Sequence, residues 1–235
     1  MTDRPIIFSA PMVRALLDGR KTQTRRILKR QPACDGVEQH PDFASEWVPY
    51  KDGEPQHSIV VPYAIGDRLY VRETHWRLGQ WLHQDGGWHF EPTPDYGPVF
   101  YAPPGAKGTR FAGEHGWWQR PAIFHERRDS RLTLTVTDVR VQRPQEISGE
   151  DAKAEGARHF PDIPDKSLSA RPDRWSMEEP PDTSHCLGSA RFAFANYWVK
   201  LHRAREHDFD AWDANPWVVA LTFTAQQRNI DAGRG

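Results

Sequence analysis

The chain is poor in cysteine, since its 235 residues include only Cys34 and Cys186. They form neither a metal-binding pair nor a disulfide framework, which argues against a small, disulfide-stapled secreted domain. Long apolar runs are absent too. None approaches the roughly 18 residues that a membrane-spanning helix needs, and the opening MTDRPIIFSA lacks the apolar core of a signal peptide. These absences predict a cytoplasmic protein with no membrane partner.

Common catalytic motifs are missing as well. The sequence contains no H-E-x-x-H, G-x-S-x-G, P-loop or G-x-G-x-x-G pattern, so none of the enzyme classes that these motifs identify is indicated. The eleven histidines are scattered, and a pair such as His83 and His89 lies more often on a surface or in a core than around a metal. The segment HDFDAWD lacks the glycine and terminal glutamate of a calcium loop. We therefore expect neither a metal nor a cofactor.

An excess of charge of one sign is also absent, because the formal net charge is −1. This balance argues against a protein that coats nucleic acid along its whole surface. The distribution is uneven, however. Residues 1–30 contain eight lysines and arginines against Asp3 and Asp18, whereas residues 31–60 contain Lys51 against six acids. The opening segment is a local basic patch, and we expect any RNA partner to bind through Arg20 to Arg30.

Hydrophobic periodicity and end signals predict both strands and helices. A helix is expected from the capping residue Ser9 to Gly19, a second from Ser148 to Gly156, and a third over residues 189–202. Alternating or β-branched stretches predict strands at PIIF, TQTRRIL, GDRLYVRETHW, RLTLTVTDVRVQRP and PWVVALTFTA.

Three stretches rich in proline, glycine or charge are predicted to be long loops or insertions, at about 31–64, 79–121 and 161–188. The second is expected to contain short strands such as PVFYA. Together these elements predict an α+β fold over residues 1–235, with a small mixed β-barrel and flanking helices in a single domain.

One short motif is specific. The stretch GRKTQTRR, residues 19–26, resembles the G-x-K-x-x-[ET]-x-R signature of the ASCH superfamily, whose domains are related to PUA-like barrels. The matching residues are Gly19, Lys21, Thr24 and Arg26. Threonine at the fifth motif residue after Gly19, where many members have glutamate, is similar to the bacterial N4-acetylcytidine amidohydrolases.

The resemblance extends through IIF, GDRLYV and VTDVRV…ISGEDAKAEG, and the longer layout resembles phage-encoded ASCH proteins with GDxLYVRET, EDAxAEG and a closing NPWV. These segments cover roughly half the chain. The three predicted loops have no counterpart in the small enzymes.

The resemblance implies a catalytic trio of Lys21, Thr24 and Glu155. Thr24 would supply the nucleophilic hydroxyl, Lys21 the base, and Glu155 a proton shuttle to the departing nitrogen or an activator of water. Lys21 can act as a base only if its pKa falls well below about 10.4. In a rival assignment Lys21 stays charged and stabilises the oxyanion, while Glu155 activates water directly. Lys21 and Thr24 can line one pocket only if Lys21 precedes the strand that carries Thr24.

Four further residues are candidates for substrate binding. Arg26 is suited to holding a partner, and Glu73 either contacts substrate or pairs structurally with Arg26. Phe8 and Trp76 can stack on a pyrimidine or belong to the core.

The expected function is therefore hydrolysis of the acyl group from an N4-acylated cytosine nucleoside, a small-molecule substrate, without a metal. The alternatives are an RNA- or modified-base-binding PUA-like module, a ribonuclease of phage origin, or a phage accessory protein without catalysis.

Overall fold

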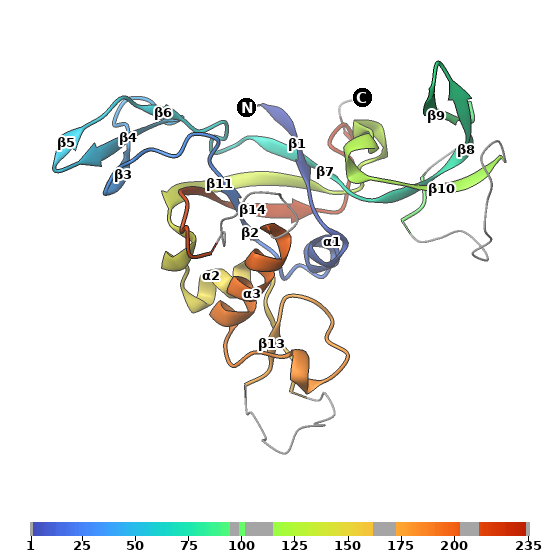
Figure 1. Cartoon of the computed structure of the whole chain (residues 1–235). Coiled ribbons are helices and arrows are strands. Elements are labelled where there is room, and N and C mark those ends of the chain that lie inside the picture. Colours follow the sequence, from blue (N-terminus) through green and yellow to red (C-terminus); the bar gives the residue numbers. More distant parts are fainter. Residues whose placement is uncertain (1, 95–98, 102–114, 162–172, 203–211, 234–235) are drawn as a thin grey trace. The chain divides into compact units, whose positions relative to one another are not determined.

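A computed structural model describes residues 2–94, 99–101, 115–161, 173–202 and 212–233 (Figure 1). Within these ranges the chain forms fourteen β-strands, three α-helices and four short 3₁₀ helices. The mixed α+β class is thus confirmed, with strands dominating. The sheets that the described strands form are open, so a closed barrel is not confirmed. No helix in these ranges is long and apolar enough to cross a membrane.

The chain divides into two compact units, each assembled from separate stretches of sequence. Unit 1 comprises Met1–Thr2, Pro11–Arg68 and Leu134–Ala225, and unit 2 comprises Asp3–Ala10, Leu69–Thr133 and Gln226–Gly235. Because neither unit is one continuous stretch, the boundary does not correspond to a linker between sequential domains.

Unit 1 contains all three α-helices and the strands beside them. Strands β11 (Thr133–Gln142), β14 (Val218–Gln226) and β2 (Gln23–Ile27) are neighbours in that order, and α2 (Gly149–Ala154) packs against both β2 and α3 (Ala190–His202). Figure 1 shows α2 and α3 on the same side of these strands. The elements that lie mainly in unit 1 are α1 (Ala10–Leu17), β2 (Gln23–Ile27), β3 (Gly36–Gln39), β4 (Glu46–Lys51), β5 (Glu54–Pro55), β6 (Ile59–Val60), β11 (Thr133–Gln142), the 3₁₀ turn Pro144–Glu146, α2 (Gly149–Ala154), β12 (Arg158–His159), β13 (Trp175–Ser176), the 3₁₀ turn Thr183–His185, α3 (Ala190–His202) and β14 (Val218–Gln226).

Helix α1 buries an apolar face and ends where the sequence predicted. Met12, Val13 and Leu16 are buried at helical spacing. Gly19 then adopts a φ of +71°, in the left-handed region that glycine tolerates best. The amides of Arg20 and Lys21 both donate to the carbonyl of Ala15, at 2.9 and 3.0 Å. The turn after α1 is therefore fixed to the end of the helix.

Helix α2 also begins and ends as predicted. The Ser148 hydroxyl accepts a hydrogen bond from the Asp151 amide at 3.0 Å, which caps the first turn. Glu155 is the C-terminal cap residue, and Gly156 follows with a φ of +115°. A helix of six residues that is fixed at both ends holds its last side chain in a defined place.

Unit 2 is built almost entirely from strands. Its elements are β1 (Asp3–Ile7), β7 (Arg68–Arg72), β8 (His75–Gln84), β9 (Gly87–Pro92), β10 (Gly116–Arg120) and the 3₁₀ turns Ala122–Phe124 and Arg127–Asp129. Strand β1 is a neighbour of β7, and β8 lies between β10 and β9 in a three-stranded antiparallel sheet.

The stretch 31–64, predicted to be a long loop or insertion, is not a plain loop, and 79–121, where short strands were expected, contains longer ones. The first contains the small sheet of β3, β4, β5 and β6, and the second most of β8 with β9 and β10. Proline within β4 and β5, and glycine within β8 and β9, hid these strands, because such residues weaken the alternating pattern. From PVFYA only residues 99–101 are described, with Phe100 forming an isolated bridge to Trp76. In 161–188 the described part holds only β13 and a 3₁₀ turn, while 162–172 and most of HDFDAWD lie outside the described residues.

Close approach of β8 and β9 predicts that Gly79 tolerates no side chain. A Cβ atom there would overlap the Glu91 carbonyl oxygen and lie 2.6 Å from Phe90 Cζ. We expect Gly79→Ala to lower the free energy of unfolding by roughly 1–3 kcal/mol, as overpacked sites do. Urea unfolding followed by tryptophan fluorescence measures this. The matched control is Gly36→Ala in β3, where a Cβ meets no described atom within 4 Å. Equal stability of the two variants would contradict the close approach.

Candidate active site

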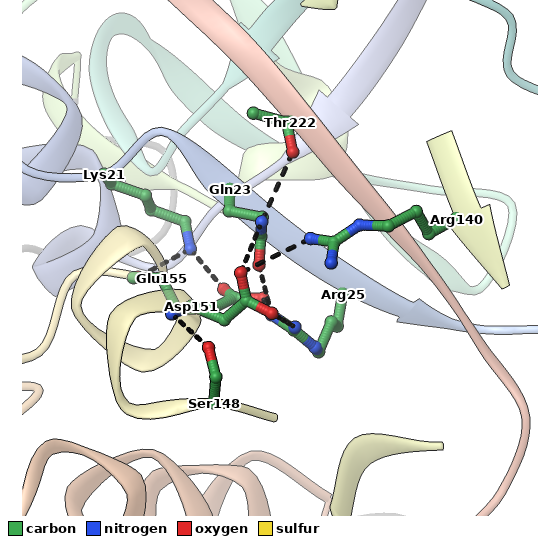
Figure 2. Close-up of polar contacts among 8 residues, drawn as sticks. All are labelled: Lys21, Gln23, Arg25, Arg140, Ser148, Asp151, Glu155 and Thr222. Carbon is green, nitrogen blue, oxygen red and sulfur yellow. Dashed lines mark hydrogen bonds and ion pairs between the residues drawn. The ribbon is translucent and has the colours of Figure 1, made fainter. Parts of the chain in front are cut away.

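A buried ion pair joins two of the three residues predicted to be catalytic (Figure 2). The Lys21 ammonium donates to Glu155 Oε2 at 2.6 Å and to the Glu155 backbone carbonyl at 2.7 Å. Lys21 is 1% exposed and Glu155 4% exposed. Charges buried to this degree are rare unless they are paired and hydrogen-bonded, and this pair meets both conditions.

Backbone contacts bring the two segments together. Lys21 lies in the turn between α1 and β2, ahead of the strand that carries Thr24. The amide of Thr22 donates to the carbonyl of Ala154 at 2.8 Å, which joins this turn to the end of α2. A Cβ at Gly156 would lie 3.3 Å from Ala15 Cβ and 3.8 Å from Lys21 Cβ, so only glycine fits this approach comfortably.

Arg25 holds the other oxygen of the Glu155 carboxylate. Its Nη1 donates to Glu155 Oε1 at 3.1 Å and to Gln23 Oε1 at 2.6 Å, while Nη2 donates to Asp151 Oδ2 at 3.0 Å. Its side chain is fully buried. Figure 2 shows these side chains converging from β2 and α2. Each Glu155 oxygen therefore has its own cation.

Asp151 is the second acceptor of the cluster. Its Oδ1 accepts from Gln23 Nε2 at 3.1 Å and from Arg140 Nη2 at 3.4 Å. Burial raises the pKa of Asp151, but the hydrogen bonds from Gln23 and Arg140 outweigh burial and hold the pKa below its ordinary value. Asp151 is thus a fixed anion that anchors Arg25.

Burial lowers the pKa of the Lys21 ammonium below its ordinary value of 10.5. The charge and hydrogen bond of Glu155 oppose this effect, and the positive charges of Arg26 and Arg25 add to it. Desolvation disfavours the charged form of an amine, so its proton is more easily given up than that of a surface lysine. Burial and the ion pair thus act in opposite directions on this ammonium, and burial prevails.

Thr24 is buried in β2, between Gln23 and Arg25 and opposite Leu221 of β14. Side chains alternate along a strand, and Gln23 and Arg25 both reach the Glu155 cluster. Alternation directs the Thr24 side chain to the other face of β2. The structure brings Lys21 and Glu155 into contact, and it does not place the Thr24 hydroxyl among the groups that surround them.

Arg26 is half-buried in β2, opposite Val219, and alternation places it on the same face as Thr24. Its charge acts on the pKa of Lys21. The remaining candidates belong to unit 2. The Glu73 carboxylate is buried and accepts two hydrogen bonds from Arg131, at 3.0 and 2.9 Å. Phe8 is buried, and Trp76 is half-buried in β8.

Sequence reasoning missed Gln23, Arg25, Arg140 and Asp151. Two signals were present. Gln23 and Arg25 are two residues apart in a predicted strand, so they share a face, and Asp151 precedes Glu155 by one helical turn. No short-range pattern in the sequence indicated that this face of the strand meets this face of the helix. Among the residues that the structure describes, no group of three or more histidines, cysteines or acids could hold a metal ion.

Comparison of the chain with protein-family models, with curated proteins and with solved structures finds no match.

The contacts of Lys21 predict how its pKa responds to its partner. Glu155→Gln removes a charge that raises the Lys21 pKa, so the pKa should fall further below 10.5. A pH titration of 13C- and 15N-labelled lysine side chains by NMR measures this, with Lys21→Arg assigning the signal. The matched control is Glu150→Gln in the same helix, which removes the exposed partner of Lys153 and should leave the Lys21 pKa unchanged. A Lys21 pKa that rises in Glu155→Gln would contradict the buried pair.

Proposed function

We propose that this protein is an amidohydrolase that removes the acyl group from N4-acylated cytosine nucleosides, with Lys21 and Glu155 at the reacting centre. The observation that carries the proposal is the buried ammonium–carboxylate contact of 2.6 Å between two residues that are 134 positions apart. The substrate class rests on the resemblance of residues 19–26 and of the α2 region to ASCH amidohydrolases. Kinship with the PUA-like barrel fold is part of the same proposal.

Hydrolysis of an amide needs a base for water, a positive group for the oxyanion and a proton for the leaving nitrogen. In the proposed reaction Glu155 takes a proton from water, and the resulting hydroxide attacks the acyl carbon. The Lys21 ammonium stabilises the negative oxygen of the tetrahedral intermediate. Glu155 then passes the proton to N4, the C–N bond breaks, and the products are a carboxylic acid and cytidine. Because both side chains are nearly sealed from solvent, substrate entry requires local movement.

The place of Thr24 favours direct attack by water over a covalent route. A covalent route needs the Thr24 hydroxyl beside its base, and alternation along β2 directs it to the opposite face from Gln23 and Arg25. Thr24 is then a wall of the core beneath the site. Arg25 supports the direct route, because it fixes Glu155 Oε1 while Oε2 faces Lys21.

The RNA-binding alternative draws on the basic segment from Arg20 to Arg30. Lys21 and Arg25 are buried in the carboxylate cluster, and Arg20 pairs with Asp18 at 2.9 Å. Of its six cations, only Lys29 and Arg30 are exposed, while Arg20 and Arg26 are half-buried. Lys21 and Arg25 are thus held inside the carboxylate cluster, which supports a buried reacting centre over a phosphate-binding surface.

Purified protein should convert N4-acetylcytidine to cytidine, which the change in ultraviolet absorbance follows. Glu155→Gln and Lys21→Met should each lower kcat by at least about 100-fold, the usual scale for removing a positioned acid or base. Glu150→Gln, on the exposed side of the same helix, should keep the wild-type rate. If the wild-type protein released no cytidine, the proposed function would be wrong.

The same assay separates the two routes. With direct attack by water, Thr24→Ala should lose no more than a few-fold in kcat, comparable with Thr22→Ala at an exposed neighbouring position. With a covalent route, Thr24→Ala should lose as much as Glu155→Gln, since residues that act as a unit fail together, while Thr24→Ser should stay active. The first pattern is the one that we expect.

The reaction should not depend on a metal ion, since a lysine and a carboxylate supply the charge and the proton transfers. Dialysis against EDTA should leave kcat within about two-fold of its starting value, because no step of acid–base catalysis by Lys21 and Glu155 uses a Lewis acid. Loss of activity on chelation, with recovery on adding zinc, would contradict the mechanism.

A further inference from the structure

Unit 1 contains a polar cleft beside the candidate active site. Its empty space of about 360 Å³ includes volume that is open to solvent, so it is a surface cleft and not an enclosed cavity. Its charged lining residues come from α1, the turn after α1, β12 and the segment that follows β13: Arg14, Asp18, Arg20, Arg158, Glu178 and Glu179. The cleft thus combines three guanidinium groups with three carboxylates.

The charged side chains that line the cleft differ in how tightly they are paired within the protein. Arg20 is held by Asp18 at 2.9 Å, and Glu178 pairs with Lys200. Arg158 and Glu179 are 3.8 Å apart and largely exposed, so this contact is loose. Arg14 is exposed, and its side chain makes no hydrogen bond or ion pair within the described part of the chain. Arg14 and Arg158 therefore remain available to an anion.

The cleft adjoins the reacting pair through the backbone. Arg20 lines the cleft and donates to the carbonyl of Gly156 at 2.8 Å. The next residue, Lys21, donates to the carbonyl of Glu155 at 2.7 Å. Two consecutive cations thus bind two consecutive carbonyls, and the first of these cations lines the cleft while the second belongs to the buried pair.

We propose that this cleft binds the ribose phosphate of the substrate, so that the preferred substrate is a nucleotide or a cytidine within a chain rather than a free nucleoside. This inference rests on the proposed function. In a cytidine nucleotide the 5′-phosphate and the N4 amide are at opposite ends. A phosphate site must therefore lie beside Lys21 and Glu155 and not between them.

The mixed charge of the cleft suits a sugar phosphate better than a bare anion. Guanidinium groups bind phosphate through paired, charge-assisted hydrogen bonds, which Arg14 and Arg158 can donate. Carboxylates accept hydrogen bonds from ribose hydroxyls, and Glu179 is placed to do so once Arg158 turns to a phosphate. The Arg158 guanidinium already lies over the ring of Phe160, 4.8 Å from its centroid, which limits its freedom.

The kinetic test compares N4-acetylcytidine with its 5′-monophosphate. The nucleotide should have a kcat/KM at least about 10-fold higher, the scale of one charge-assisted hydrogen bond. Arg14→Ala and Arg158→Gln should each reduce this preference several-fold. Lys51→Ala, which removes an exposed cation of unit 1 that does not line the cleft, should leave the preference unchanged. Equal kcat/KM for nucleoside and nucleotide would overturn the inference while leaving the amidohydrolase in place.

A binding test needs no turnover and so separates the two proposals. Cytidine, cytidine 5′-monophosphate, oligocytidylate and inorganic phosphate are titrated into 15N-labelled protein, and amide shifts are mapped. Cytidine 5′-monophosphate should bind at least about 10-fold more tightly than cytidine and should shift the amide signals around Arg14 and Arg158. Its affinity should be lower for the Arg14→Ala variant. Tighter binding of oligocytidylate through the same signals would identify a polymer substrate.

One outcome is that the protein binds phosphate-bearing ligands at the cleft and yet hydrolyses neither acetylated substrate. That result would support the phosphate site and refute the proposed amidohydrolase activity. Equal affinity for cytidine and cytidine 5′-monophosphate, with no shifts at the cleft, would refute the ribose-phosphate site.

Discussion

The Lys21–Glu155 ion pair is the interaction on which this part of the molecule depends. Removing one partner of a buried pair costs roughly 3–5 kcal/mol, because the remaining charge loses both water and its counter-ion. Such a pair persists only if both groups are held in place. Here Gly19, the Thr22–Ala154 hydrogen bond and the cap of α2 supply that constraint through backbone geometry.

The same constraint gives the cluster its chemistry. Lys21 is stripped of water, which lowers its pKa, while the carboxylate beside it opposes that shift. Arg25 holds the other oxygen of this carboxylate, because Gln23 and Asp151 fix its guanidinium. Burial, charge and position thus act together on one hydrogen bond.

The basic run after α1 contributes side chains both to the cleft and to the buried carboxylate cluster. Arg20 faces a cleft, Lys21 and Arg25 enter the buried cluster, and Lys29 and Arg30 remain in solvent. The turn before β2 and the alternation along it separate these directions. A run that looks uniform by composition is therefore divided by geometry into a part that lines a cleft, a buried part and a solvated part.

Local signals in the sequence were enough to locate the elements that frame the site. Ser9, Gly19, Ser148 and Gly156 mark helix ends, and the alternation from Leu132 onward marks β11, because caps and periodicity depend on adjacent residues. The strands within 31–64 were hidden, since proline and glycine interrupt their pattern while pairing with one another still stabilises them. Only the tertiary structure decided that Lys21 contacts Glu155 and that Arg25 and Asp151 complete the cluster. These contacts join segments more than 120 residues apart, and a short-range pattern carries no information about which distant faces meet.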